Sequence, residues 1–175
     1  PLYLGLAPFK NIQTRTKRTL MVYGFDPDSQ IFKIDAIDDK RAELRLKDTV
    51  LFDEYSRPEF GPMRQLLAAD QNVTEINDYK VTVVGLFRLG VSFAADGNVV
   101  TSDLNFMRIF SRRNHEDIDL GVIKLHPGAS ATQVQAALRS QLNEFVNIFT
   151  YEELLSYEKD YWANTAPIGF IFGFG

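Results

Sequence analysis

The residues best suited to chemistry in this chain are two histidines, two carboxylate pairs and one loop serine. His115 and His126 lie in polar turns, and neither has neighbouring Asp, Glu or His residues at the spacing of metal ligands. We therefore interpret both histidines as surface residues. Because the chain contains no cysteine, a thiol nucleophile, a disulfide framework and a zinc site built on cysteine are excluded.

The carboxylate pairs are typical of turns rather than of a metal site. Asp26 and Asp28 flank a proline, and Asp53 and Glu54 follow directly on an apolar run. A hard cation needs a longer run of oxygen ligands than either pair provides. Ser92 lacks the second glycine and the strand-to-helix setting of a hydrolase nucleophile. With no phosphate-binding or dinucleotide-binding pattern in the sequence either, we predict no catalytic, metal-binding or cofactor-binding residue.

The composition is that of a globular protein with an acidic balance. Of the 175 residues, 45% are hydrophobic and 24% are charged, which allows a sizeable core. The net charge of −4 argues against a nucleic-acid partner, because such proteins usually carry a basic excess on one face.

Turn residues and alternation indicate how these residues are positioned. Short apolar runs predict strands at residues 2–6, 19–25, 49–52 and 99–101. The clearest hairpin joins strands 73–76 and 79–87 through Asn77 and Asp78. Pro62 suits the first position of a helix, and Ser102 is a candidate helix cap.

The last third predicts a βαβ unit over residues 118–149. Alternating apolar residues favour a strand over 118–125, and a short apolar run favours another over 146–149. Between them, Ser130 and Gln133 form the pattern of a capping box, which begins a helix. Thr150 and Glu153 predict a second helix in the same way. Together with the hairpin, these elements predict an α+β fold of mixed α/β type.

The C-terminal segment admits more than one interpretation. Residues 168–175 are wholly apolar, so they form either a buried strand or the first turns of a transmembrane helix, for which about 20 apolar residues are needed. Tyr157, Tyr161 and Trp162 precede them at helical spacing. They are candidates for core residues, for a ligand-stacking surface, or for aromatic residues at a membrane interface. The order of aromatic helix, proline and apolar run favours the membrane interface.

The loop over residues 90–98 also has two interpretations. It is either a turn whose Phe93 folds back onto the core, or an exposed apolar tip that docks a partner, since loops on a rigid scaffold often carry binding. The candidate partner-contact residues are Val91, Phe93, Asp96, Gly97 and Asn98.

Several segments, taken in order, resemble the DevC family, the permease subunits of cyanobacterial DevBCA-type ABC exporters, which are related to MacB and FtsX-like permeases. The resemblance covers essentially the whole chain and rests on residues 23–28, 49–62, 84–98, 124–128 and 158–163, followed by 167–172. It implies a MacB-like periplasmic domain of an inner-membrane protein. A porter lobe formed by residues 1–57 and 113–166 is implied, with an inserted, strand-rich sabre lobe at 58–112. Residues 167–175 then begin a transmembrane helix.

The resemblance also implies a non-catalytic function. The domain docks a periplasmic adaptor, or membrane fusion, protein and transmits ATP-driven motion for export of an envelope glycolipid or similar substrate. The implied partners are that adaptor, a second permease copy, a cytoplasmic ATPase subunit and the membrane through flanking helices. The alternative is a soluble small-molecule sensor whose βαβ unit forms a cleft lined by Tyr157, Tyr161 and Trp162.

Overall fold

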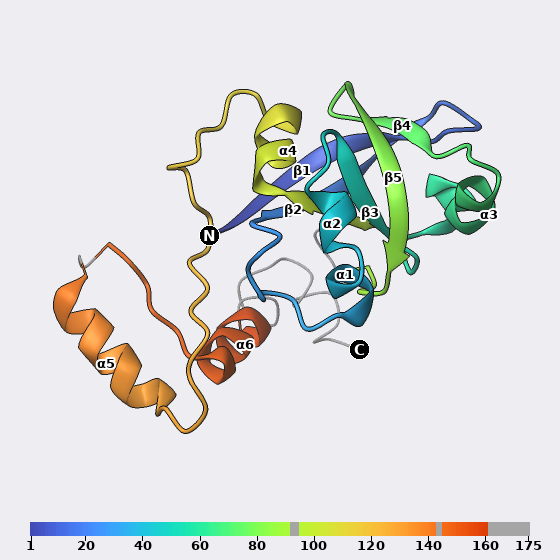
Figure 1. The fold of residues 1–175 in the computed structure, drawn as a ribbon. Helices are drawn as coiled ribbons and strands as arrows, with labels where there is room; N and C mark the ends of the chain where they lie inside the picture. Colours follow the sequence, from blue (N-terminus) through green and yellow to red (C-terminus); the bar gives the residue numbers. More distant parts are fainter. Residues whose placement is uncertain (92–94, 143–144, 161–175) are drawn as a thin grey trace, which may run out of the picture. The chain divides into compact units, whose positions relative to one another are not determined.

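A computed structural model describes residues 1–91, 95–142 and 145–160, and it contains both strands and helices (Figure 1). The expectation of an α+β fold is therefore confirmed. The chain divides into two compact units, Pro1–Lys124 and Leu125–Gly175. The first unit is built on a sheet, whereas the described part of the second contains helices without strands.

Six strands of the first unit form a closed barrel. They are β1 (Leu2–Lys10), β2 (Lys17–Phe25), β3 (Thr49–Asp53), β4 (Val73–Ile76), β5 (Tyr79–Phe87) and β6 (Asn98–Ser102). Around the barrel their order is β1-β2-β6-β3-β5-β4, and the pairing of Phe9 with Ile76 closes the ring. The pairs β2–β6 and β3–β5 are parallel, and the others are antiparallel.

The barrel has an internal two-fold relation. Exchanging β1 with β4, β2 with β5 and β3 with β6 reproduces the same ring. In each half, the chain leaves a hairpin, crosses the end of one strand and enters the strand beyond it. From β5 it crosses the end of β3 to reach β6, and from β2 it crosses the end of β6 to reach β3. These two crossings decide which residues meet at the ends of the barrel.

Apolar side chains fill the barrel and also cover one outer face. All six strands contribute to the interior cluster, where the rings of Phe9, Phe52 and Phe60 lie with centroids 5.4, 5.6 and 5.9 Å apart. A second cluster includes Ile37 of α1 (Asp35–Asp38) and Leu44 of α2 (Arg41–Leu44). Because both faces are covered, every residue of β3 and of β6 is buried.

The local signals of the sequence are confirmed where turns and caps are concerned. The hairpin joins β4 and β5 through Asn77 and Asp78, whose φ angles of 53° and 60° are those of a type I′ turn. Ser102 accepts a hydrogen bond from the Asn105 amide and begins α4 (Asp103–Ile109). Two further short helices, η1 (Pro58–Phe60) and α3 (Met63–Ala68), follow β3.

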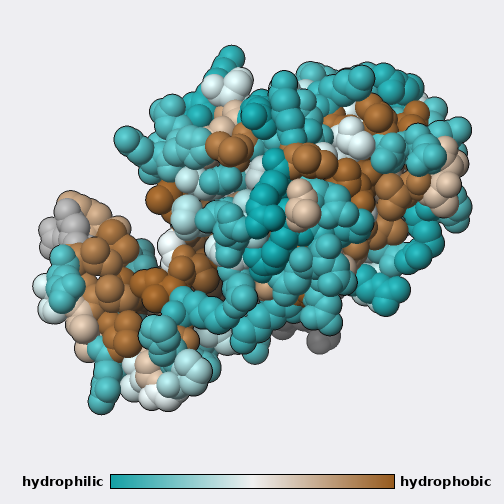
Figure 2. Space-filling model, in the orientation of Figure 1, coloured by the Kyte–Doolittle hydropathy of each residue, from teal (hydrophilic) through white to brown (hydrophobic). Residues whose placement is uncertain are grey.

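The second unit contains α5 (Ala131–Gln141) and α6 (Tyr151–Asp160). The hydroxyl of Ser130 accepts the Gln133 amide, as the first capping box predicts. In the second box both bonds form, from Glu153 N to Thr150 Oγ1 (3.2 Å) and from Thr150 N to the Glu153 carboxylate (2.9 Å). Figure 2 shows hydrophobic surface, in brown, over the segment that carries α5.

The helix of the predicted βαβ unit is present, but the prediction of its two strands is wrong. Residues 118–125 contribute one isolated bridge, between Leu120 and Leu2, and residues 146–149 form no strand. The alternating Ile118, Leu120 and Val122 are 39–50% exposed, because no described strand covers them. A cleft formed by a βαβ unit, on which the sensor interpretation depends, is therefore missing from the described residues.

The expected lobes also differ from the division that the structure shows. Strands β4, β5 and β6 lie within the expected sabre lobe at 58–112, yet they pair with β1, β2 and β3 of the expected porter lobe. One barrel therefore takes strands from both. The expected start of a transmembrane helix at 167–175 lies outside the described residues, among which no helix is long and apolar enough to cross a bilayer.

Gly24 tests the contact between α4 and β2. A Cβ at this position lies 2.5 Å from Phe106 Cβ, an atom held by the helix backbone, so Gly24→Ala forces the two elements apart. We expect this change to lower the free energy of unfolding by about 2–3 kcal/mol, measured by urea denaturation. The matched control is Gly121→Ala, where a Cβ meets no atom within 4 Å, and a change under about 1 kcal/mol is expected. Equal effects of the two changes contradict this packing.

Candidate partner-contact site

The carboxylate of Asp53 organises one end of the barrel. Asp53 is the last residue of β3, and the chain crosses β3 at this end on its way from β5 to β6. Its side chain is fully buried and accepts four hydrogen bonds. The donors are the amides of Tyr55 (3.0 Å), Leu89 (2.9 Å) and Gly90 (2.8 Å) and the side-chain amide of Asn98 (2.8 Å).

This arrangement answers the main physical difficulty of a buried carboxylate. A carboxylate removed from water is strongly destabilising unless donors replace its hydration. Here four neutral N–H groups do so. Three of them are backbone amides, one from the loop that follows β3 and two from the loop that joins β5 to β6. Asn98 also connects β6 to the crossing loop, because its side-chain nitrogen donates both to Asp53 and to the carbonyl of Gly90 (2.6 Å). Asp53 also acts on Tyr23: burial first, and then the charge of Asp53, raises the pKa of the Tyr23 phenol.

A second set of contacts joins residues 53–61 to residues 95–98. The backbone N–H of Arg57 donates to the backbone carbonyl of Asp96 (2.9 Å), and the backbone N–H of Asn98 donates to the hydroxyl of Ser56 (3.2 Å). Gly97 lies against both Ser56 and Phe60, so that a Cβ there approaches them to 2.6 and 2.8 Å. The two loops are therefore packed as one body, which we call the loop pair (residues 53–61 and 88–98, of which 92–94 lie outside the described residues).

Ion pairs cover the outside of the loop pair. Glu54 accepts from Arg64 Nε (2.5 Å) and Arg88 Nε (3.1 Å). Asp96 lies 2.7 Å from nitrogens of both Arg18 and Arg57. Arg64, and after it Arg88, lowers the pKa of the Glu54 carboxyl. Because exposed ion pairs contribute little stability, this layer matters more for what it presents to solvent.

Three large apolar side chains of the loop pair face solvent: Tyr55 (56% exposed), Leu89 (47%) and Val91 (48%). The backbone amides of Tyr55 and Leu89 meet at one oxygen of Asp53. The guanidinium of Arg88 lies 5.6 Å from the centre of the Tyr55 ring. The loop pair thus exposes apolar side chains close to arginines, and its backbone is held by the hydrogen bonds to Asp53.

The predicted contact residues separate into two groups. Val91 is exposed as expected, and Asp96 is half-exposed but engaged with two arginines. Gly97 and Asn98 are buried, and this corrects the expectation that they touch a partner: the crossing over β3 draws them inside. Phe93 lies outside the described residues. Sequence reasoning missed Tyr55 and Leu89, although the pair Asp53-Glu54 drew attention to the same loop.

The remaining candidates show no shared chemistry. His115 and His126 are both exposed, and no group of three or more His, Asp or Glu residues in the described chain is arranged to hold a metal ion. Asp26 forms a turn, as predicted, by accepting from the Asp28 amide (2.9 Å). Tyr157 is 55% exposed, and its ring lies 5.4 Å from that of Phe149; Tyr161 and Trp162 lie outside the described residues.

Comparison of this chain with protein families, curated proteins and solved structures finds no match.

Asp53→Asn tests the anchoring of the loop pair. The asparagine NH₂ group replaces an accepting oxygen and faces donors, so one or two buried N–H groups lose their partner. We expect a loss of about 2–4 kcal/mol in the free energy of unfolding, measured by urea denaturation. Asp70→Asn is the matched control, because Asp70 is exposed and asparagine also tolerates its positive φ. An Asp53 variant as stable as this control contradicts the anchoring role.

Glu54 gives a prediction for pH. Because its folded pKa lies below the ordinary value of 4.5, the ion pairs stabilise the fold above that value and lose this effect as the pH falls through the folded pKa. In a ¹³C NMR titration of the side-chain carboxyls, we expect Glu54 to titrate below 4.5. Arg64→Gln or Arg88→Gln should raise its midpoint. A midpoint that neither change moves contradicts the pairing.

Proposed function

We propose that this chain is a non-catalytic periplasmic domain of an ABC exporter permease, and that its loop pair docks a periplasmic adaptor protein. Two lines support this. The sequence resembles DevC-type permeases along its whole length, including residues 49–62 and 84–98, which contain the loop pair. The observation that carries the docking is the anchoring by Asp53, which holds Tyr55, Leu89 and Val91 at the surface of a closed barrel.

The proposed role follows from what such a surface can do. A domain that transmits motion needs a contact that moves as one piece with its scaffold, and the loop pair is hydrogen-bonded to β3 and β6 at its base. ATP hydrolysis belongs, in this proposal, to a cytoplasmic subunit. A second permease copy and the membrane are contacted through the flanking helices, and the adaptor receives the motion that drives export of an envelope lipid or glycolipid.

The parent gene provides a first test. In this proposal the reading frame encodes about 20 apolar residues before Pro1 and continues the apolar run beyond residue 175. Sequencing the gene on both sides decides this. A stop codon soon after residue 175, with no apolar span upstream, overturns the permease assignment.

Adaptor binding tests the docking itself. We expect the 175-residue chain to bind the adaptor encoded beside the parent gene, and Val91→Asp to weaken binding at least about tenfold without lowering the melting temperature, measured by biolayer interferometry and calorimetry. Val73→Asp is the matched control, because Val73 is 43% exposed and lies on β4, where it pairs with Thr82 of β5, six residues before the loop pair begins at residue 88. We expect it to change binding less than twofold, on the same scale. Wild-type chain that fails to bind, or a control that weakens binding equally, contradicts the proposal.

A further inference from the structure

Arg57 and Arg88 of the loop pair, and Arg64 of α3 beside it, have exposed guanidinium groups that can bind anions. Arg57, Arg64 and Arg88 have side chains that are 55%, 63% and 62% exposed. Among the described residues each is paired with one carboxylate, whereas a guanidinium offers five N–H donors in a planar fork. Of the three, Arg88 also lies 5.6 Å from the centre of the exposed Tyr55 ring.

The charges of this exposed layer do not balance among themselves. Four arginines share three carboxylates: Glu54 holds two of them, Asp96 holds two, and Glu59 makes a further contact with Arg18 (3.4 Å). Asp53 lies below this layer with its oxygens occupied by amides. The exposed layer by itself thus has one arginine more than its carboxylates, and the charge of Asp53 beneath it, which neutral amides do not cancel, offsets this excess.

The apolar and charged groups together have the composition of a protein interface. Interface centres are enriched in tyrosine and arginine, and they commonly place apolar groups inside a polar rim. Here Tyr55, Leu89 and Val91 supply the apolar part. Arg88 lies over the Tyr55 ring and shares Glu54 with Arg64, and Arg57 is paired with Asp96. We call these six residues the loop-pair surface.

We infer that the loop-pair surface binds an acidic protein segment in which carboxylates surround an apolar side chain. Carboxylates match the free guanidinium donors in pairs, and the apolar side chain covers Tyr55, Leu89 and Val91. A nucleic acid fits less well, because the exposed apolar centre offers no partner to a phosphate backbone and the chain is acidic overall. The inference rests on the proposed function in that the adaptor is the source of this segment.

The test uses defined probes rather than the adaptor. The ¹⁵N-labelled 175-residue chain is titrated with an eight-residue peptide whose glutamates flank a Leu-Phe-Leu centre. A matched peptide has lysine in place of glutamate, and a third probe is a twelve-residue oligothymidylate. We expect the acidic peptide to shift the amide signals of Tyr55, Leu89 and Gly90, and the lysine peptide to leave them unchanged.

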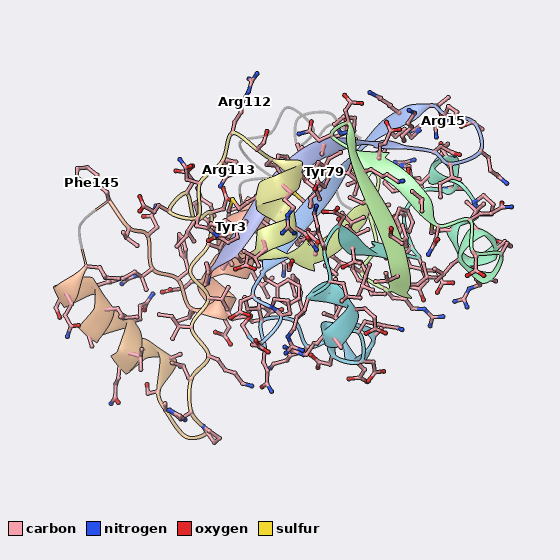
Figure 3. All side chains as sticks on the ribbon, turned by 45° about the horizontal axis from the view of Figure 1, so that its top comes forward. Tyr3, Arg15, Tyr79, Arg112, Arg113 and Phe145 are labelled. Atoms are coloured by element: carbon pink, nitrogen blue, oxygen red, sulfur yellow. The ribbon has the colours of Figure 1, made fainter. Side chains whose placement is uncertain are left out.

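Substitutions assign the effect to the arginines. Arg64→Gln and Arg88→Gln should each weaken binding of the acidic peptide about fivefold. Arg112→Gln is the control, because Arg112 is exposed, extends away from the chain (Figure 3) and has no ion pair among the described residues. We expect it to change binding less than twofold, on the same scale. Melting temperatures of the three variants confirm that each is folded.

Each outcome decides one question. Shifts elsewhere, no shifts, or equal shifts from the lysine peptide overturn the inference. Tighter binding of oligothymidylate than of the acidic peptide also overturns it and assigns the surface to nucleic acid. Acidic-peptide binding at the loop-pair surface without adaptor binding supports the inference and overturns the proposed function. Adaptor binding that is insensitive to Arg64→Gln and Arg88→Gln keeps the proposed function and overturns the inference.

Discussion

The buried carboxylate of Asp53 is the constraint on which this end of the molecule depends. In the ring, β3 lies between β5 and β6, so the chain that joins those two strands has to pass over the end of β3. Its backbone leaves the β5 ladder at that point and needs new hydrogen-bond partners. Asp53 provides them, because its two oxygens accept the amides of Leu89 and Gly90 and hold Asn98 at the start of β6. One side chain thereby fixes where the loop leaves the barrel and where it returns.

The other crossing shows that the same topological problem has a different solution. Where the chain passes from β2 to β3 over the end of β6, Ser102 ends the strand and caps α4, and Asn105 of that helix binds the carbonyls of Leu46 (2.9 Å) and Thr49 (3.3 Å). That crossing is long and contains α1 and α2, which bury it under their own apolar residues. The crossing at Asp53 is short, its described residues contain no helix, and Leu89 and Val91 remain at the surface.

The sequence predicted what local chemistry determines and failed where distant segments decide. The hairpin at Asn77 and Asp78 and the two capping boxes depend on residues at most four positions apart. The hairpin and the box at Thr150 and Glu153 are present in full, and at Ser130 the hydroxyl accepts the Gln133 amide. The strands expected at 118–125 and 146–149 are absent, because alternating apolar and polar residues form a strand only when another strand is available to pair with them. Gly97 and Asn98 were expected at the surface, since nothing near them in sequence reveals that β3 ends beneath them. Tyr55 and Leu89 were missed for the same reason: they become neighbours only through Asp53, more than thirty residues from Leu89.

The chemistry of the anchor also suits the mechanical role that we propose. An anchor built on an exposed ion pair weakens as salt screens it and as its long side chains exchange partners. Asp53 instead holds the loop pair through three backbone amides, which have no rotamers to exchange, and through the buried side-chain amide of Asn98. The exposed arginines differ from this anchor. Their long side chains can change partners, and their guanidinium groups, which pair with carboxylates of this chain, can also bind a carboxylate of another protein. A surface that has to receive a partner and pass force to its scaffold requires both properties, and here they lie in two layers, with exchangeable ion pairs outside and a fixed carboxylate within.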